Sequence, residues 1–170
     1  NSILDMDVLL DEVVEVIHKR FGYPYVHLFT THWGRRTVEY VAGSGQRSEM
    51  ICEKCLLYSI DDPQGIIPWV ARTGQLRLVN DISQDPLYRP FELTPDETCS
   101  ELCVPLKFAD EVLGVLDIQS ERPNAFDPAD LSLFQSLASS IAVALRNASM
   151  YRTERWRRQV ADSFREVASL

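Results

Sequence analysis

The stretch SELCVPLKFADEVLGVLDIQSERPNAF, residues 100–126, decides the fold of this 170-residue chain. Two apolar runs, 100–108 and 112–120, surround the short polar link ADE, and this order predicts an antiparallel β-hairpin. The apolar residues of the second run do not alternate strictly, so both sides of that strand carry apolar side chains. Strands of this kind are buried on both faces. We therefore place the hairpin in the middle of a sheet that is covered on both sides.

A long amphipathic helix is predicted after the hairpin. Asp127 suits its N-cap, Pro128 suits its first position, and Asp130 complements the helix dipole. Neither Gly nor Pro occurs in residues 129–170, which at about 1.5 Å per residue allows a helix of roughly 60 Å. A stripe of apolar residues continues along it with a change of phase near Arg152, and comprises Leu131, Phe134, Ala138, Ile141, Leu145, Ala148, Trp156, Val160, Phe164 and Val167. Such a stripe needs a partner, and a parallel helix from a second subunit is the simplest one.

The first part of the chain predicts a helix and a strand pair. Apolar residues at helical spacing indicate a helix over 6–21. Residues 25–33 and 37–45 are rich in β-branched and aromatic side chains and flank a turn, which indicates two antiparallel strands. The pattern of 46–64 fits either a short helix or an irregular cover.

A short helix, a short strand and a long loop are predicted before the central hairpin. Pro68 in the first turn and Gly74 at the end favour a helix over 65–74, and 76–80 is typical of a strand. Residues 81–97 contain three prolines and no periodicity, which indicates a long surface loop. Long ordered loops are commonly functional.

The composition excludes several classes of protein. A net charge of −8 argues against nucleic-acid binding. The arginines of segment 151–170 are interpreted as lying on the solvent-exposed face of a connecting helix. The acidic start lacks the positive charge of a secretory signal, and the absence of a long uncharged apolar run argues against membrane insertion. Four cysteines in a chain of this kind indicate free thiols and a cytoplasmic location.

The order of these elements resembles the GAF domain, a small-molecule sensor module of bacterial signalling proteins. The resemblance rests on GIIPWVARTGQLRLVNDISQDPLYRP (65–90), SELCVPLKFADEVLGVLDIQSE (100–121) and AFDPADLSLFQSLASSIAVALRNASMY (125–151). It implies an α+β fold with a central antiparallel sheet of five to six strands. The N- and C-terminal helices would cover one face, and a short helix with loops would cover the other face and enclose a ligand pocket.

The resemblance also implies an organisation and partners. Residues 1–150 would form the sensor domain, and 151–170 would begin a C-terminal signalling or linker helix. The terminal helices would pair in a homodimer and pass the ligand state to an output domain in the same polypeptide. That output would be of the histidine kinase or diguanylate cyclase type, as in two-component systems.

The four cysteines raise the alternative of a metal or redox site. Cys52 and Cys55 have the two-residue spacing of zinc and iron–sulfur ligands, and Cys99 and Cys103 would complete four thiolates. If 99–103 were all strand, four steps of about 3.3 Å would place the last two cysteines roughly 13 Å apart, too far for one ion. The site therefore requires Cys99 to lie in the preceding loop, and buried core thiols are the simpler interpretation.

The residues give little support for cyclic-nucleotide, bilin or haem binding, which occur in members of the family, or for enzymatic catalysis. Phe126 and Asp130 match the motif of cyclic-nucleotide-binding members, but Leu131 and the QSE of 119–121 depart from it. No cysteine is followed by histidine, as in bilin-binding members, and haem would need His27 or His32 as axial ligand. No motif for nucleophilic or acid–base catalysis occurs, so we expect no enzyme.

The expected function is non-enzymatic sensing of a small molecule. The predicted pocket residues lie on the strands, the short helix and the long loop, and comprise His27, Phe29, Trp69, Tyr88, Phe91, Cys103 and Asp117. Asp117 stands in a mostly apolar strand, so it must be paired or face the pocket. The alternatives are a cysteine-based metal, iron–sulfur or redox sensor and a ligand-free dimerisation or spacer domain. The sequence specifies neither a cofactor nor the identity of the ligand.

Overall fold

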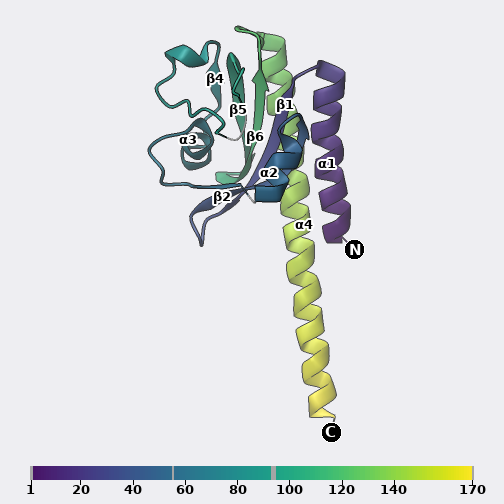
Figure 1. Cartoon of the computed structure of the whole chain (residues 1–170). Helices are drawn as coiled ribbons and strands as arrows, with labels where there is room; N and C mark the ends of the chain where they lie inside the picture. Colours follow the sequence, from purple (N-terminus) through teal and green to yellow (C-terminus); the bar gives the residue numbers. More distant parts are fainter. Residues whose placement is uncertain (1, 55, 93–94, 170) are drawn as a thin grey trace.

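One six-stranded antiparallel sheet organises the computed structural model, which describes residues 2–54, 56–92 and 95–169 (Figure 1). The strand order is β3-β2-β1-β6-β5-β4. The strands are β1 (Tyr25–His32), β2 (Thr37–Gly45), β3 (Leu57–Ser59), β4 (Arg77–Val79), β5 (Ser100–Phe108) and β6 (Glu111–Ser120). The hairpin of β5 and β6 lies inside the sheet, with β6 paired to β1 and β5 paired to β4, which confirms its predicted position.

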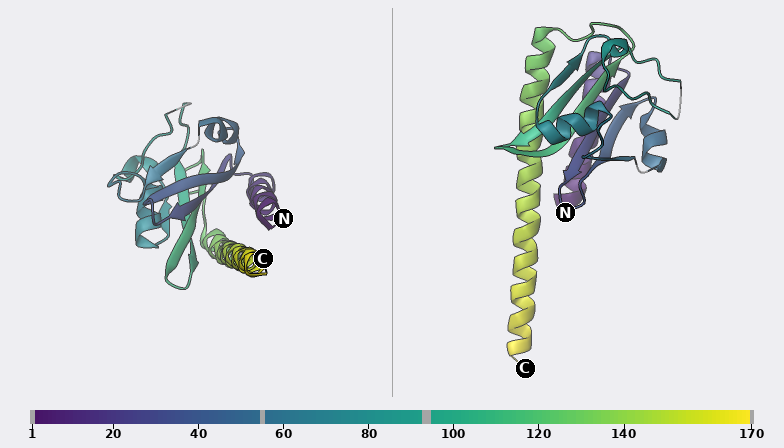
Figure 2. Two further views of the ribbon diagram at one scale, coloured as in Figure 1. Left: turned by 90° about the horizontal axis from the view of Figure 1, so that it is seen from below. Right: turned by 90° about the vertical axis from the view of Figure 1, so that its left-hand side faces the viewer.

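The helices form two unequal layers on the sheet. They are α1 (Ser2–Phe21), α2 (Ser48–Lys54), α3 (Ile66–Thr73), the 3₁₀ turn η1 (Ile82–Gln84) and α4 (Pro128–Ala168). Viewed along α4, helices α1 and α4 lie side by side on one side of the sheet, and α3 with the loops lies on the other (Figure 2). The predicted α+β architecture is therefore confirmed.

Alternate residues of the central strands supply two separate cores. Val26, Leu28, Leu116 and Ile118 face α1 and α4 and belong to the larger core. Their neighbours on the strands face α3, where Phe29 contributes to a smaller core. This period of two is the normal consequence of a pleated strand. It means that each central strand touches both layers of the domain.

Helix α4 begins as the sequence predicts. The Asp127 side chain accepts a hydrogen bond from the Asp130 amide, the Asp130 side chain accepts one from the Asp127 amide, and Pro128 occupies the first turn. This reciprocal capping box satisfies two amides that would otherwise lack partners. The helix is 41 residues long, and it extends beyond the sheet on the side where α1 begins (Figures 1 and 2).

Only the first part of α4 packs against the domain. Its buried residues end at Ala148, and three of the large apolar side chains after that point, Trp156, Phe164 and Val167, are exposed. By length and composition this helix also contains a window that could cross a membrane, with a mean hydropathy of 1.2, which the sequence analysis did not anticipate. A core helix passes the same test, and Phe134, Ala138 and Ile141 of α4 are part of the larger core.

Candidate ligand pocket

A cavity of about 300 Å³ lies on the α3 side of the sheet. Its floor is polar and comes from β1, β5 and β6, whereas its walls come from α2, β3, α3 and the loop before β5. The described lining residues are His27, Arg47, Ile51, Leu56, Tyr58, Gly65, Ile66, Ile67, Pro68, Tyr88, Arg89, Pro90, Phe91, Glu92, Glu101, Asp117 and Gln119. A mostly apolar concavity with a few convergent polar groups is the usual form of a small-molecule site.

Strand register assembles the polar floor. His27 of β1 is directly opposite Asp117 of β6, and Gln119 of β6 is directly opposite Glu101 of β5. All four side chains point to the same face because they occupy alternate positions on their strands. The ring Nδ1 of His27 lies 3.8 Å from Oδ2 of Asp117, and Nε2 of Gln119 donates to the same oxygen at 2.9 Å.

Glu101 and Asp117 form a buried acid pair. Burial, followed by the charge of Asp117 and their mutual hydrogen bond, raises the pKa of Glu101 well above its ordinary value. Burial would also raise the pKa of Asp117, but hydrogen bonds from other groups, first among them Glu101, lower it. Two close carboxyls that cannot both ionise share one proton. Glu101 therefore keeps the proton and donates it to the Asp117 carboxylate.

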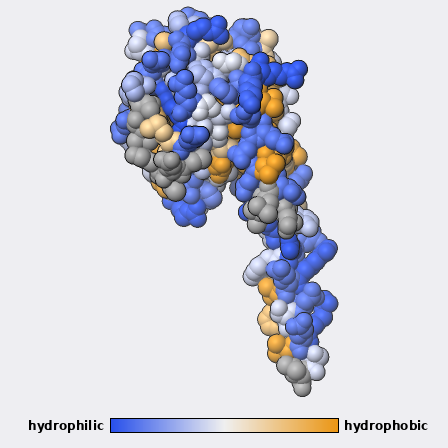
Figure 3. Space-filling view, turned by 45° about the vertical axis from the view of Figure 1, so that its right-hand side comes forward, coloured by the Kyte–Doolittle hydropathy of each residue, from blue (hydrophilic) through white to orange (hydrophobic). Residues whose placement is uncertain are grey.

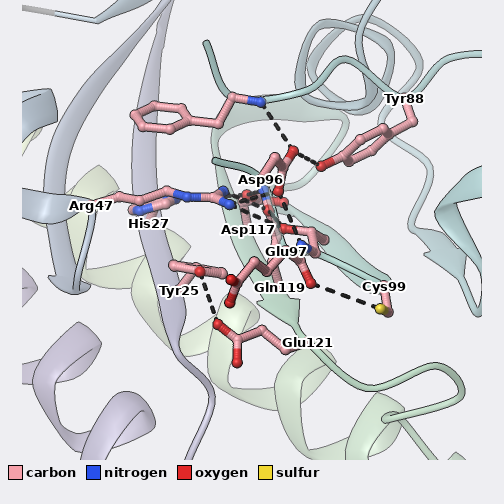
Figure 4. Close-up of polar contacts among 12 residues, drawn as sticks. Tyr25, His27, Arg47, Tyr88, Asp96, Glu97, Cys99, Asp117, Gln119 and Glu121 are labelled. Atoms are coloured by element: carbon pink, nitrogen blue, oxygen red, sulfur yellow. Dashed lines mark hydrogen bonds and ion pairs between the residues drawn. The ribbon is translucent and has the colours of Figure 1, made fainter. Parts of the chain in front are cut away.

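Arg47 joins the floor to the loop before β5. Its guanidinium donates to Oδ1 of Asp96 at 2.6 Å and to Oε1 of Gln119 at 3.0 Å, and it lies 3.7 Å from the centre of the Tyr25 ring (Figure 4). The Phe91 ring lies on it as well, at 4.8 Å. Planar stacking and forked hydrogen bonding are characteristic of arginine at buried positions. Arg47 thus fixes this loop against the pocket floor.

Asp96 is the anionic end of this network. It accepts hydrogen bonds from the Tyr88 hydroxyl and the Phe91 amide in addition to the Arg47 guanidinium. Burial alone would raise its pKa, but hydrogen bonds, first those from Tyr88 and Thr98, outweigh burial and hold the pKa at about 2. Asp96 is therefore ionised at neutral pH and compensates the charge of Arg47.

Three buried polar atoms at the pocket remain without a donor or acceptor among the described side chains, counting carboxyls as ionised. They are Nε2 of His27, Nε of Arg47 and Oδ1 of Asp117, the last of which the Glu101 proton satisfies, so that the two nitrogens remain unpartnered. The three side chains are 4%, 2% and 0% exposed, respectively. Buried polar atoms without partners cost free energy, so they commonly mark the place of a bound group.

The family follows from a comparison over nearly the whole chain. A profile of the GAF domain matches residues 4–146. The chain belongs to the GAF domain family. This match confirms the resemblance drawn from the central hairpin and its flanking helices.

The relatives of this GAF domain are longer regulatory proteins. The formate hydrogenlyase transcriptional activator FhlA of Escherichia coli K12 is 26% identical over 156 residues, and its counterpart in Salmonella typhimurium is 25% identical over 167. The alignment covers 88% of this chain and 22% of each activator. The chain thus spans about a fifth of the length of these relatives, each of which is a transcriptional activator.

Solved structures of low identity share the GAF fold. The GAF domain of the phosphoenolpyruvate-protein phosphotransferase from Coxiella burnetii superposes with a TM-score of 0.78 at 20% identity, covering 87% of this chain and 86% of that one. Free methionine-R-sulfoxide reductase from Neisseria meningitidis, solved with its substrate, gives a TM-score of 0.73 at 19% identity, covering 86% and 81%. The fold therefore occurs in both regulatory domains and enzymes.

The structure brings four of the seven predicted pocket residues together at the cavity of this GAF domain. His27, Tyr88, Phe91 and Asp117 line it.

The other three predicted residues, Phe29, Trp69 and Cys103, are not among the described lining of this cavity. Phe29 and Cys103 lie in the smaller core, filling the space between β1, β5 and α3. Trp69 packs at the outer side of this core and lies under the Arg77 guanidinium, 4.8 Å from ring centre to Cζ. Its position on α3 turns it away from the cavity that Ile66 and Ile67 face.

Sequence reasoning missed Arg47, Glu101 and Gln119. Glu101 had a usable signal, because an acid two positions before Cys103 in an apolar strand must share its face with Asp117 across the hairpin. Arg47 had none, since it follows Gly45 at the start of a segment whose pattern indicated no definite structure.

The structure describes the side chains of Cys99 and Cys103, two of the four cysteines of the predicted metal site. Cys99 precedes β5, as the predicted metal site requires, and Cys103 is fully buried. Burial raises the pKa of the Cys103 thiol well above its ordinary value, which disfavours the thiolate. The Cys52 side chain and Cys55 lie outside the described residues, and within the described part no three His, Cys, Asp or Glu side chains form a metal-binding group. The four-cysteine site therefore stays a prediction.

Proposed function

We propose that this GAF domain is a sensory module that binds a small molecule in the pocket and passes its bound state through α4 to an output module in the same polypeptide. The observation that carries the proposal is the cavity with the unpartnered buried nitrogens of His27 and Arg47, on the side of the sheet opposite α1 and α4. A spacer domain without a ligand would gain stability by filling such a cavity with apolar side chains.

The central strands provide a route from the pocket to α4. His27 of β1 and Asp117 of β6 face the cavity, whereas their chain neighbours Val26, Leu116 and Ile118 pack in the core beside α4. A ligand that forms polar contacts with the floor would shift strands that pack directly against α4. A ligand biases α4 only if it binds one arrangement of the strands better than the other.

A homodimer through the terminal helices would receive this shift. Apolar side chains gather on the α1–α4 side of the body and again near the C-terminal end of α4 (Figure 3). The exposed apolar residues of these two regions are Val8, Leu9, Val16, Phe21, Leu133, Val143, Trp156, Phe164 and Val167. Patches of this kind mark protein interfaces. Pairing of two α4 helices would cover both regions.

The location and the output are proposed from the relatives and the charge. The transcriptional activators that the chain resembles are bacterial proteins about five times longer than the match. We place this domain in the cytoplasm of a bacterium, beside an output that is a histidine kinase, a diguanylate cyclase or, as in those relatives, a transcriptional activator. Residues 151–170 would be the start of the connecting helix.

We propose that the domain binds its ligand without converting it chemically. The thiol of Cys103 is buried and neutral, so it is a poor nucleophile and a poor redox group. Asp117 and Glu101 share a proton at the floor, but no described nucleophile accompanies them in the pocket lining. The likeness to methionine sulfoxide reductases is one of fold.

A thermal-shift screen with a blocked-pocket control tests the proposal. Metabolites present at about 100 times their Kd raise the melting temperature of a domain of this size by roughly 5–10 °C. Hits should stabilise the wild-type domain and leave Ile67→Trp, in which the new ring fills the cavity, without response. Hydrogen exchange then reports transmission, because amides of α4 near Ala138 and Ala148 should change protection when a hit binds. Binding without any change in α4 would contradict the sensory role.

A further inference from the structure

The basic side chains that line the pocket are already paired with acids outside it. Nη2 of Arg47 lies 2.6 Å from Asp96, and Nη2 of Arg89 lies 2.8 Å from Asp62. Neither Asp96 nor Asp62 is part of the lining. An anionic ligand would therefore have to break an existing ion pair before it could use either arginine.

The acids at the floor of the pocket, in contrast to these arginines, have no close partner of opposite charge among the described side chains. Among the described side chains, the only basic group within salt-bridge distance of Asp117 or Glu101 is the His27 ring, at 3.8 Å, which exceeds the length of a hydrogen bond. Asp117 is fully buried and Glu101 is 3% exposed. The one negative charge that the pair holds is thus buried without a close cationic partner, which is costly.

The surroundings of this charge suit an organic cation. Tyr58, Tyr88 and Phe91 present rings to the cavity, and the charges of Asp117 and Glu101 contribute to raising the pKa of Tyr58 to about 12, after burial as the larger cause. Tyr58 lines the same cavity as Asp117 and Glu101. A cation beside carboxylates and aromatic faces gains from both.

We propose that the ligand of this pocket carries a protonated nitrogen, held at the floor by the Asp117 carboxylate beside Glu101, and an apolar body that contacts the aliphatic and aromatic walls. The walls that would receive this body are formed by Ile51, Leu56, Ile66, Ile67, Pro68 and Phe91. The proposal rests on the sensory function and adds the chemical class of the ligand to it: a small primary amine that fits about 300 Å³.

Three probes of matched shape test this class by calorimetry at pH 7. They are 2-phenylethylamine, which is a cation at this pH, its neutral analogue 2-phenylethanol, and the anion 3-phenylpropanoate. A hydrogen-bonded charge pair in a buried site is worth about tenfold to a hundredfold in affinity. The amine should therefore bind at least tenfold more tightly than the alcohol, and the carboxylate should bind most weakly.

Matched substitutions locate the preference at the floor. Asp117→Asn removes the charge and should reduce the preference for the amine over the alcohol to less than threefold, while alcohol binding remains. Asp110→Asn makes the same chemical change at the exposed turn between β5 and β6 and should leave the preference intact. If Asp117→Asn does not fold, the ranking of the three probes on the wild-type domain decides by itself.

The possible failures separate this proposal from the sensory function. Equal or tighter binding of the alcohol or the carboxylate overturns the ligand class, whereas the pocket would still be a binding site. Absence of amine binding overturns the class too, and the metabolite screen with Ile67→Trp then decides independently whether the pocket binds anything.

Discussion

The two faces of the sheet differ in how they use the same strands. Toward α1 and α4, Leu116 and Ile118 pack with Phe134 into a core whose members are almost fully buried. Toward α3, the intervening Asp117 and the facing His27 border a cavity and leave polar atoms unpartnered. One face supplies stability, whereas the other leaves a cavity and unpartnered polar atoms that cost stability, as is common at functional sites.

Truncating a buried side chain on each face gives the largest expected difference. Leu116→Ala on the helix side should lower the free energy of unfolding by about 3–4 kcal/mol, because it leaves a new cavity in a packed core. Ile67→Ala should cost less, about 2 kcal/mol, because this side chain already borders empty space. Urea denaturation of both variants measures the two costs. Equal costs would mean that the α3 side is packed as tightly as the helix side.

The acid pair predicts a pH dependence that only the pocket side shows. Since the pKa of Glu101 is raised in the folded state, the folded domain keeps a proton that the unfolded chain releases above about pH 4.5. Stability is therefore fully present below that pH and falls as the pH rises toward the folded pKa, with a slope near 1.4 kcal/mol per pH unit. Denaturation curves from pH 5 upward should show this loss.

Glu101→Gln is the control for the pH dependence. The amide cannot ionise, so the variant should lose the slope above pH 4.5 while keeping the same shape of side chain. A slope that persists in Glu101→Gln would assign the titration to another group.

Loosening the start of α4 should affect the helix side alone. Asp127→Ala removes the side chain that accepts the Asp130 amide, and losing such a cap costs about 1 kcal/mol. Denaturation should report that loss, while probe affinity in the pocket stays within twofold of wild type. A large change in affinity would show that the pocket senses the beginning of α4 directly.

The smallest effect on domain stability is expected in the projecting part of α4. Trp156→Glu with Phe164→Glu replaces exposed apolar residues, and exposed substitutions usually change the free energy of unfolding by less than about 0.5 kcal/mol. If these residues pair between subunits, light scattering should show a monomer instead of the dimer of the wild type. A monomeric wild type, or a dimer that survives both changes, would contradict the proposed homodimer.

Regular elements were predictable because local rules and packing agree there. The apolar runs of β5 and β6 and the Asp127–Pro128 start of α4 are strong local signals, and the structure has both. The segment 46–64 gave no definite prediction because α2 and β3 are short, with seven and three residues, and their conformation depends on tertiary contacts.

The pocket was only partly predictable because side-chain direction depends on the exact phase of each element. Alternation placed His27 and Asp117 correctly on one face of the sheet, and it could have placed Glu101 there. Trp69 was assigned to the pocket because it stands on the short helix predicted to cover this face, but the structure places Ile66 and Ile67 of α3 at the cavity and Trp69 against the smaller core. Arg47 is positioned by Tyr25, Gln119 and Asp96, all distant in sequence, and no local pattern specifies such contacts.

The projecting part of α4 would amplify a small tilt at the sheet into a large displacement of its far end. From Ala148, the last buried residue, to Ala168 the helix continues for about 20 residues without a break, or about 30 Å. A tilt of roughly 10° where the helix leaves the sheet would move its far end sideways by about 5 Å, a displacement comparable to one turn of a helix. A subångström strand movement beneath the proposed ligand would in this way become a change of position large enough to realign the proposed output module.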